Sequence, residues 1–168
     1  AMDKRMHIEL VTETYPPELN GAAMSVGRMV DGLRARGHEI ELIRPRQSSE
    51  QACANLDEYR TPGLPIPMYR ELRIGLPMVR TLATRWLGHP PDMVHVATEG
   101  PLGWAAVRAA RIAGLPVTSD FRTDFERYCS HYGWGWLSQI VAGYLRHFHK
   151  RTDCTFVPTR QLQARLQS

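Results

Sequence analysis

Residues 7–45 read HIELVTETYPPELNGAAMSVGRMVDGLRARGHEIELIRP and predict a strand, a helix and a second strand. Segment 7–12 is short and mostly apolar, as a buried strand is. Paired prolines and an Asn-Gly pair predict a loop over 15–21. Apolar residues recur at intervals of three and four over 22–33, which is the pattern of one helix face. Segment 39–43 is again strand-like, so this part of the chain forms one strand–helix–strand unit.

Two residues fix the ends of these elements. Gly37 is expected to end the helix in the left-handed conformation, which glycine adopts without a steric penalty. Pro45 is expected to end the second strand because it has no amide hydrogen to give to a sheet. The alternation continues beyond an irregular, proline-rich excursion over 61–77. The further expected elements are a strand near Tyr59, helices over 78–88, 101–114 and 136–150, strands over 92–97, 117–121 and 154–158, and a helix starting at 160.

This alternation with short connections predicts an α/β fold with a doubly wound, mostly parallel sheet and helices on both faces. The 168 residues suit a single domain, with residues 1–5 left outside the fold. The chain ends within the last expected helix, which favours a longer natural protein.

Composition excludes several classes of protein. Hydrophobic residues make up 43% of the chain without any long uninterrupted apolar run, so a membrane-spanning segment is not expected. Cys53, Cys129 and Cys154 share no metal-ligand spacing, which favours free thiols in a reducing cytoplasm over a zinc site or disulfides. The net charge of +4 suits anionic partners. The sequence has no motif typical of nucleic-acid-binding proteins, so nucleic acid is not an expected partner.

Ligands of an open parallel sheet bind beyond the carboxyl ends of its strands. The loops that follow the expected strands therefore hold the candidate residues. These loops are 15–23, 98–100, 122–127 and 159–160.

Asn20, Gly21 and Ala22 place small residues at the start of the first helix. A helix N-terminus offers unpaired N–H groups and a positive dipole end, and small residues let a phosphate approach the backbone. A tight turn that uses small residues for packing explains the same pattern, so both interpretations stay open here.

Segment 122–127 brings two arginines, two acids and a threonine directly after an expected strand. The planar fork of arginine suits the binding of phosphate or carboxylate. A surface cluster of ion pairs at a helix start is the alternative. The aromatic residues over 128–136 suit stacking with a sugar, with core packing as their alternative.

Several segments occur in the order found in one enzyme family. They are Thr14-Tyr15-Pro16-Pro17, Asn20-Gly21, residues 33–40, Pro91-Asp92-Met93-Val94-His95, Gly100-Pro101-Leu102-Gly103, Gly114-Leu115-Pro116-Val117, Phe121-Arg122-Thr123 and Val157-Pro158-Thr159. From about Met6 to about Gln163 the chain resembles glycosyltransferase family four, whose members are retaining enzymes of the GT-B architecture.

The resemblance implies two Rossmann-like domains that face each other across a cleft. Residues 1–168 would form the acceptor-side domain, and the nucleotide-sugar-binding domain would be absent from this chain. The isolated chain is therefore expected to be inactive. The implied partners are a nucleotide sugar and a lipid or saccharide acceptor. Neither a cofactor nor a metal is expected, since basic groups and helix N-termini would stabilise the leaving diphosphate.

The resemblance also implies roles for loop residues. Gly21 and Ala22, with Asn20 before them, would lie near the donor diphosphate. Arg122 and Thr123 would be the catalytic pair near the transferred sugar. The expected acceptor-binding residues are Tyr15, Glu99, Arg127 and Tyr128, and Thr159 is a further expected cleft residue.

Two positions depart from the family pattern. Arg122 stands where the family usually has histidine. Because a guanidinium stays charged near neutral pH, Arg122 is not expected to act as an acid–base group. It is expected to be an electrostatic partner of a phosphate or an acidic acceptor. Ala22 stands where the family often has glycine, which restricts the approach of the backbone to a phosphate.

The leading hypothesis is glycosyl transfer at the inner face of the cell membrane, catalysed in the cytoplasm. Segments 78–87 and 146–151 suit peripheral contact with an anionic membrane, and ordinary packing explains each equally well. A stand-alone phosphate- or nucleotide-binding module without catalysis is the alternative. A dinucleotide-dependent oxidoreductase is disfavoured because the first loop lacks the GxGxxG pattern.

Overall fold

The computed structural model describes residues 4–16, 21–46, 57–66, 69–120 and 135–157. Its strands are β1 (His7–Val11), β2 (Glu39–Pro45), β3 (Glu58–Thr61), β4 (Gly63–Ile66), β5 (Tyr69–Gly75), β6 (Met93–Val96), β7 (Val117–Asp120) and β8 (Cys154–Phe156). Its helices are α1 (Gly21–Ala35), α2 (Val79–Gly88), α3 (Pro101–Ile112) and α5 (Gly135–His149).

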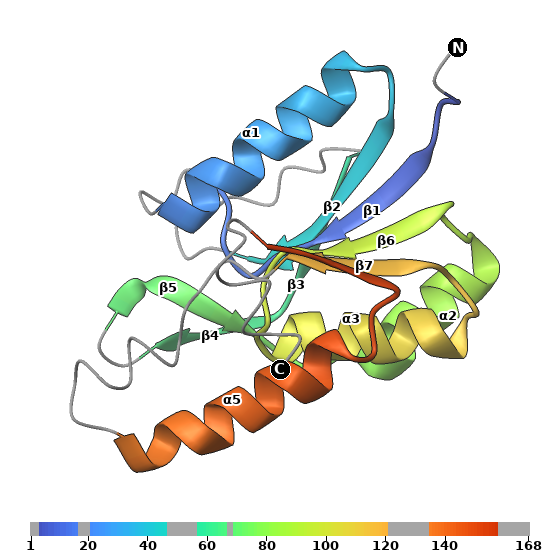
Figure 1. Ribbon diagram of the computed structural model, residues 1–168. Coiled ribbons are helices and arrows are strands. Elements are labelled where there is room, and N and C mark those ends of the chain that lie inside the picture. Colours follow the sequence, from blue (N-terminus) through green and yellow to red (C-terminus); the bar gives the residue numbers. More distant parts are fainter. Residues whose placement is uncertain (1–3, 17–20, 47–56, 67–68, 121–134, 158–168) are drawn as a thin grey trace.

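Six strands form one parallel sheet in the order β3-β2-β1-β6-β7-β8 (Figure 1). The chain builds outward from β1 through β2 to β3, then crosses to the other side of β1 to add β6, β7 and β8. This order confirms the expected α/β, doubly wound fold. The order in which strands are added reverses between β1 and β6, and this position is the switch point of the sheet. Such a fold binds its ligands at the carboxyl ends of the two strands next to the switch point.

Helices cover both faces of the sheet. Successive residues of each strand point to opposite sides, so one strand contributes side chains to the cores on both faces. Ile8 and Leu10 of β1 pack with Val26 and Val30 of α1 on one face. Val11 belongs to a second core on the other face, which is covered by α2, α3 and the end of α5 (Figure 1). Both cores are apolar and fully buried, so the central strands are fixed from both sides.

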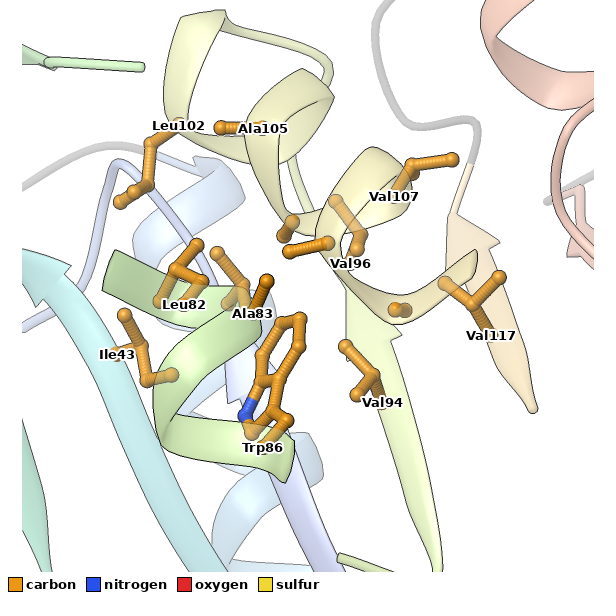
Figure 2. Packing of buried hydrophobic residues seen from close by; sticks show 14 of the residues in the cluster. Ile43, Leu82, Ala83, Trp86, Val94, Val96, Leu102, Ala105, Val107 and Val117 are labelled. Carbon is orange, nitrogen blue, oxygen red and sulfur yellow. The ribbon is translucent and has the colours of Figure 1, made fainter. Parts of the chain in front are cut away.

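Trp86 is the largest side chain of the second core. Figure 2 shows its indole among Leu82, Ala83 and Val94, and it is 1% exposed. Burial of an apolar side chain of this size stabilises the fold by about 2–3 kcal/mol. Its Nε1–H donates to Glu9 of β1, which satisfies the one polar atom that the indole brings into the core.

The end of α1 is the predicted left-handed glycine cap. Gly37 has φ +87°, its N–H donates to the carbonyl of Arg34 at 2.9 Å, and the His38 N–H donates to that of Leu33 at 3.2 Å. This pair of bonds is the Schellman arrangement, which satisfies carbonyls that have no partner within the helix. Among the described helices, none is long and apolar enough to cross a bilayer.

The expectation of an irregular excursion over 61–77 is wrong. β4 and β5 form an antiparallel hairpin there, in which Pro65 pairs with Arg73 and the register shifts between Pro65 and Ile66. Proline is tolerated because a two-stranded hairpin has outer edges where no amide hydrogen is needed. The strand expected near Tyr59 is present as β3.

Candidate functional site

Only part of the predicted site lies within the described residues. Tyr15, Gly21, Ala22 and Glu99 are described, and all four follow β1 or β6 at the carboxyl edge of the sheet. The predicted site residues outside the described part are Asn20, Arg122, Thr123, Arg127, Tyr128 and Thr159.

The loops after β1 and β6 are joined directly at the switch point. The backbone N–H of Glu13 donates to the hydroxyl of Thr98 at 2.9 Å. The backbone N–H of Ala97 donates to the carbonyl of Val11 at 2.8 Å, which continues the pairing of the two strands. The structure therefore brings together the two loops that the sequence analysis placed at this edge.

The start of α1 has the properties expected of a phosphate-binding helix end. Gly21 is exposed, and among the described residues nothing lies within 4 Å of where its Cβ would be. Packing of the described chain thus gives no reason for a glycine here. The first turn of α1 carries no acidic side chain. A positive helix end without a carboxylate of its own is suited to an external anion.

Tyr15 is half-buried and packs against the core beneath α1. Burial raises the pKa of its hydroxyl, and the positive charge of Arg34 opposes that rise. Its ring therefore supports the position of α1 at the carboxyl edge. Its role in acceptor binding stays a prediction.

Glu99 is 8% exposed and is held by α5 at two points. Its side-chain Oε1 lies 3.3 Å from Nε2 of His149, and its backbone carbonyl accepts a hydrogen bond from the Tyr144 hydroxyl at 2.7 Å. Burial, followed by the charges of Glu13 and Glu99, raises the pKa of Tyr144 to about 12. The hydroxyl therefore keeps its proton and remains a donor to the Glu99 carbonyl.

A chain of polar contacts extends from Glu99 into the sheet. Nδ1 of His149 is 2.9 Å from the hydroxyl of Ser119, which is also within hydrogen-bond distance of Thr152 and Thr155, at 3.0 and 3.2 Å. Ser119 is completely buried, so this chain cannot meet a substrate directly. It fixes the side chain of Glu99 from within.

A second buried pair lies at the end of β7. Nε2 of His95 is 3.4 Å from Oδ2 of Asp120, and Nδ1 of the same ring is 2.8 Å from the hydroxyl of Thr118. The carboxyl edge on the β6–β7 side therefore contains acids and histidines, whereas the α1 side offers a helix N-terminus.

Glu13 is a residue of this edge that the sequence analysis missed. Burial raises the pKa of its carboxyl to about 7, and the negative charge of Glu99 adds to this rise. The backbone N–H groups of Gly75, Gly103 and Leu102 lower the pKa and so oppose the rise. An acid two residues after a buried strand, opposite the start of a helix, was the available signal. The candidate loop predicted from the sequence begins at Tyr15, two residues too late.

A further acidic cluster lies away from this edge, on the α2 face of β1 and β2. His7, Glu9 and Glu41 place one ligand atom each within 4.8 Å of one another. The guanidinium of Arg85 lies 3.3 Å from Glu9 and also pairs with Glu41. Burial raises the pKa of Glu9, while Trp86 and Arg85 oppose the rise. Because an arginine supplies the positive charge, the cluster is built as a structural ion-pair network.

Comparison with known proteins identifies the family. The sequence profile of Glycosyltransferase Family 4 matches residues 19–168. A GDP-mannose-dependent alpha-mannosyltransferase of Mycolicibacterium smegmatis is 33% identical over 159 residues, which cover 92% of this chain and 42% of that protein. An alpha-monoglucosyldiacylglycerol synthase of Acholeplasma laidlawii is 27% identical over 167 residues, which cover 94% of this chain and 42% of that protein.

The catalytic domain of starch synthase IV from Arabidopsis thaliana, solved with ADP and acarbose, matches 70% of this chain and 34% of its own with a TM-score of 0.43 and 11% identity. This similarity is too low to bear on function. The chain spans about two fifths of the length of the curated relatives named above. The profile match over almost the whole chain and the relative above 30% identity agree with the parallel sheet and its switch point: the chain belongs to glycosyltransferase family 4.

Proposed function

We propose that this chain is the acceptor-side domain of a longer retaining glycosyltransferase. Residues 1–168 form one domain, and a second domain that binds the nucleotide sugar completes the cleft. The enzyme moves a sugar from a nucleotide-sugar donor to a lipid or saccharide acceptor. The observation that carries the proposal is the family match over 19–168 on a fold whose open helix start lies at the ligand-binding edge.

GDP-mannose is the first donor to test, because several relatives are described as GDP-mannose-dependent alpha-mannosyltransferases. Asn20, Gly21 and Ala22 would approach its diphosphate at the N-terminus of α1. Arg122, next to Thr123, would contribute a fixed positive charge near the transferred group. No metal is proposed, since the helix end and basic groups supply the positive charge that a departing diphosphate needs.

The acceptor is proposed to be a lipid or a saccharide. Two relatives are described as alpha-monoglucosyldiacylglycerol synthases, which act on a lipid. Tyr15, Glu99, Arg127 and Tyr128 are the proposed acceptor residues, with Thr159 at the edge of the cleft. The last turn of α5 is basic, which supports contact with the anionic inner face of the cell membrane.

The test compares the natural full-length protein with residues 1–168 alone. Release of nucleoside diphosphate is measured over a panel of GDP-, UDP- and ADP-sugars, with lipid extracts and simple saccharides as acceptors. We expect the full-length protein alone to turn over one donor. If neither protein releases nucleotide from any donor, the enzyme proposal is wrong and a non-catalytic phosphate-binding module is the better description.

A matched pair of variants tests the helix end itself. Gly21→Asp and Gly32→Asp each add a carboxylate to α1 at an exposed glycine with open space around it. An acid in the first turn stabilises a helix but repels a phosphate there. We therefore expect Gly21→Asp to raise the donor KM by about tenfold or more, as loss of a charge-assisted phosphate contact does. Gly32→Asp should leave the donor KM unchanged, and equal effects of the two variants would exclude this helix end as the diphosphate site.

A further inference from the structure

Glu13 ties three segments of the chain together at the switch point. Its backbone N–H donates to the Thr98 hydroxyl at 2.9 Å, in the loop after β6. Its side-chain Oε2 accepts a hydrogen bond from the backbone N–H of Gly75 at 3.1 Å, at the base of the β4–β5 hairpin. The backbone N–H groups of Gly103 and Leu102, in the first turn of α3, lower the pKa of the same carboxyl, while its Oε1 is buried without a hydrogen-bond partner among the described residues.

Glycines make room for this carboxylate and for the close approach of the loops. A Cβ at Gly100 would lie 1.9 Å from Oε1 of Glu13 and 2.3 Å from its Cδ. Gly100 has φ −74°, so its backbone would accept other residues, but a side chain here would have to displace the Glu13 carboxylate. A Cβ at Gly103 would lie 2.0 Å from the carbonyl oxygen of Thr98, and one at Gly75 would lie 2.5 Å from the Cβ of Leu102.

The Glu13 side chain occupies one of the two helix starts at this edge. Two helices, α1 and α3, begin at the carboxyl edge next to the switch point, and each start has a positive dipole end. The occupied one is the start of α3, because the Glu13 carboxyl lies against its N-cap residue Gly100. The first turn of α1 has no acidic side chain, so the two helix ends differ in what they can offer an external anion.

We propose that Glu13 is a positioning residue: its side chain occupies the N-terminus of α3 and fixes the loop that leads to α1. As a result, α1 is the helix whose N-terminus receives the donor diphosphate. This inference rests on the proposed transferase function. Glu13 leads by two residues into Tyr15, which packs under α1, and Pro16 lies 3.0 Å from where a Cβ of Gly27 in α1 would be. A shift of Glu13 is therefore transmitted to the position of α1.

The groups around the carboxylate come from four parts of the chain. Gly75 and the start of α3 supply N–H donors, Glu99 adds a negative charge from the loop after β6, and Tyr144 of α5 is close enough for its hydroxyl to respond to the charge of Glu13. Among the described residues, backbone N–H groups act on the carboxyl from α3, and the ionisable groups that interact with it are Glu99 and Tyr144. The position of Glu13 thus depends on steric fit and on backbone donors.

A double-mutant cycle in the full-length protein tests this contact. Gly100→Ala, Glu13→Ala and the double variant are compared for melting temperature and for donor KM and kcat, with GDP-mannose or the active donor of the panel as the probe. Gly32→Ala is the matched control, because it adds the same methyl group to an exposed glycine with open space. In case Glu13→Ala does not fold, Glu13→Asp, which draws the carboxylate back by one methylene, takes its place in the cycle. Glu13→Gln keeps the side-chain size and removes only the charge.

We expect Gly100→Ala to lower the melting temperature by about 4 °C or more. It should also raise the donor KM by about tenfold, as displacement of a loop by less than an ångström can. In the Glu13→Ala background the same Gly100→Ala change should alter neither quantity. Glu13→Ala and Glu13→Gln should themselves raise the donor KM more than they lower kcat.

Three results would overturn the inference. The first is an equal effect of Gly100→Ala in both backgrounds, which means that the two residues do not interact. The second is a lower melting temperature of Gly100→Ala with an unchanged donor KM, which means that Glu13 has only a structural role. The third is an effect of Gly32→Ala on donor KM as large as that of Gly100→Ala. Failure of the proposed function is distinguishable, since it shows as no turnover of any donor by the wild-type protein.

Discussion

Replacing Glu13 by glutamine should change how stability depends on pH. Burial raises the pKa of this carboxyl from 4.5 to about 7 in the folded protein. Below pH 4.5 the group is protonated in both the folded and the unfolded state, so it costs nothing. Between pH 4.5 and 7 the unfolded state loses the proton first, so the free energy of unfolding falls as the pH rises. Above pH 7 the loss is complete.

The size of the effect follows from the shift in pKa. The difference between 7 and 4.5 is 2.5 units, and at 1.36 kcal/mol per unit this corresponds to about 3 kcal/mol. Between pH 5 and pH 8, where measurement is practical, the free energy of unfolding of the wild type should fall by about 2–3 kcal/mol relative to Glu13→Gln. Glutamine has the same shape but does not ionise, so this part of the pH dependence disappears in the variant.

Urea unfolding of both proteins at several pH values measures this difference. Tryptophan fluorescence, to which the buried Trp86 contributes, reports unfolding of the core. Glu39→Gln is the matched control, because the Glu39 side chain is 60% exposed and pairs with the exposed Arg5 at 3.6 Å. Parallel curves of stability against pH for the wild type and Glu13→Gln would refute the burial of this carboxyl at the start of α3.

Three further predictions concern other charged residues. Arg85→Met removes the cation that pairs with two carboxylates on β1 and β2, one of them buried. It should lower the free energy of unfolding by about 3 kcal/mol in urea at pH 7, and a loss below about 1 kcal/mol would contradict the ion-pair network. Arg122→Ala should lower kcat/KM for the donor more than threefold in the nucleotide-release assay, and a smaller effect would remove Arg122 from the catalytic residues. Neutralising Arg146, Lys150 and Arg151 together should weaken binding to anionic phosphatidylglycerol vesicles at least tenfold in a co-sedimentation assay, at about 1 kcal/mol per cation. Neutral phosphatidylcholine vesicles serve as the control, and unchanged binding would contradict the membrane contact.

The main sheet was predictable because each strand carries its own signal. Segment 7–12 is apolar and lies between turn residues, and Gly37 marks a helix end that only glycine fits well. The hairpin over β4 and β5 was not predictable in the same way. Its prolines suppress the local strand signal, and they are acceptable because, within the described part of the chain, β4 and β5 form a sheet of their own with two outer edges. That is a property of the tertiary structure.

The site was predictable in its location but not in its contacts. Parallel strands place their following loops at one edge, which is why Gly21 and Glu99 could be assigned to it from the sequence. The partners of Glu99 could not, because His149 is fifty residues away and reaches it only through the packing of α5. Glu13 was missed for a related reason: its donors come from Gly75 and α3, and nothing next to it in sequence indicates them.

The two expected effects of Glu13→Gln have opposite signs, and this separates positioning from stability. Above pH 7 the variant should be more stable than the wild type, because the cost of a buried charge is gone. In the same pH range it should bind the donor less well, because glutamine offers the backbone N–H groups of Gly75 and α3 one uncharged acceptor oxygen in place of a carboxylate, so the loop leading to α1 is held less firmly. A variant that gains stability and loses donor affinity cannot owe the loss to unfolding. A buried acid that lowers stability near neutral pH is an exception to good packing, and such exceptions are expected where a protein positions its functional groups.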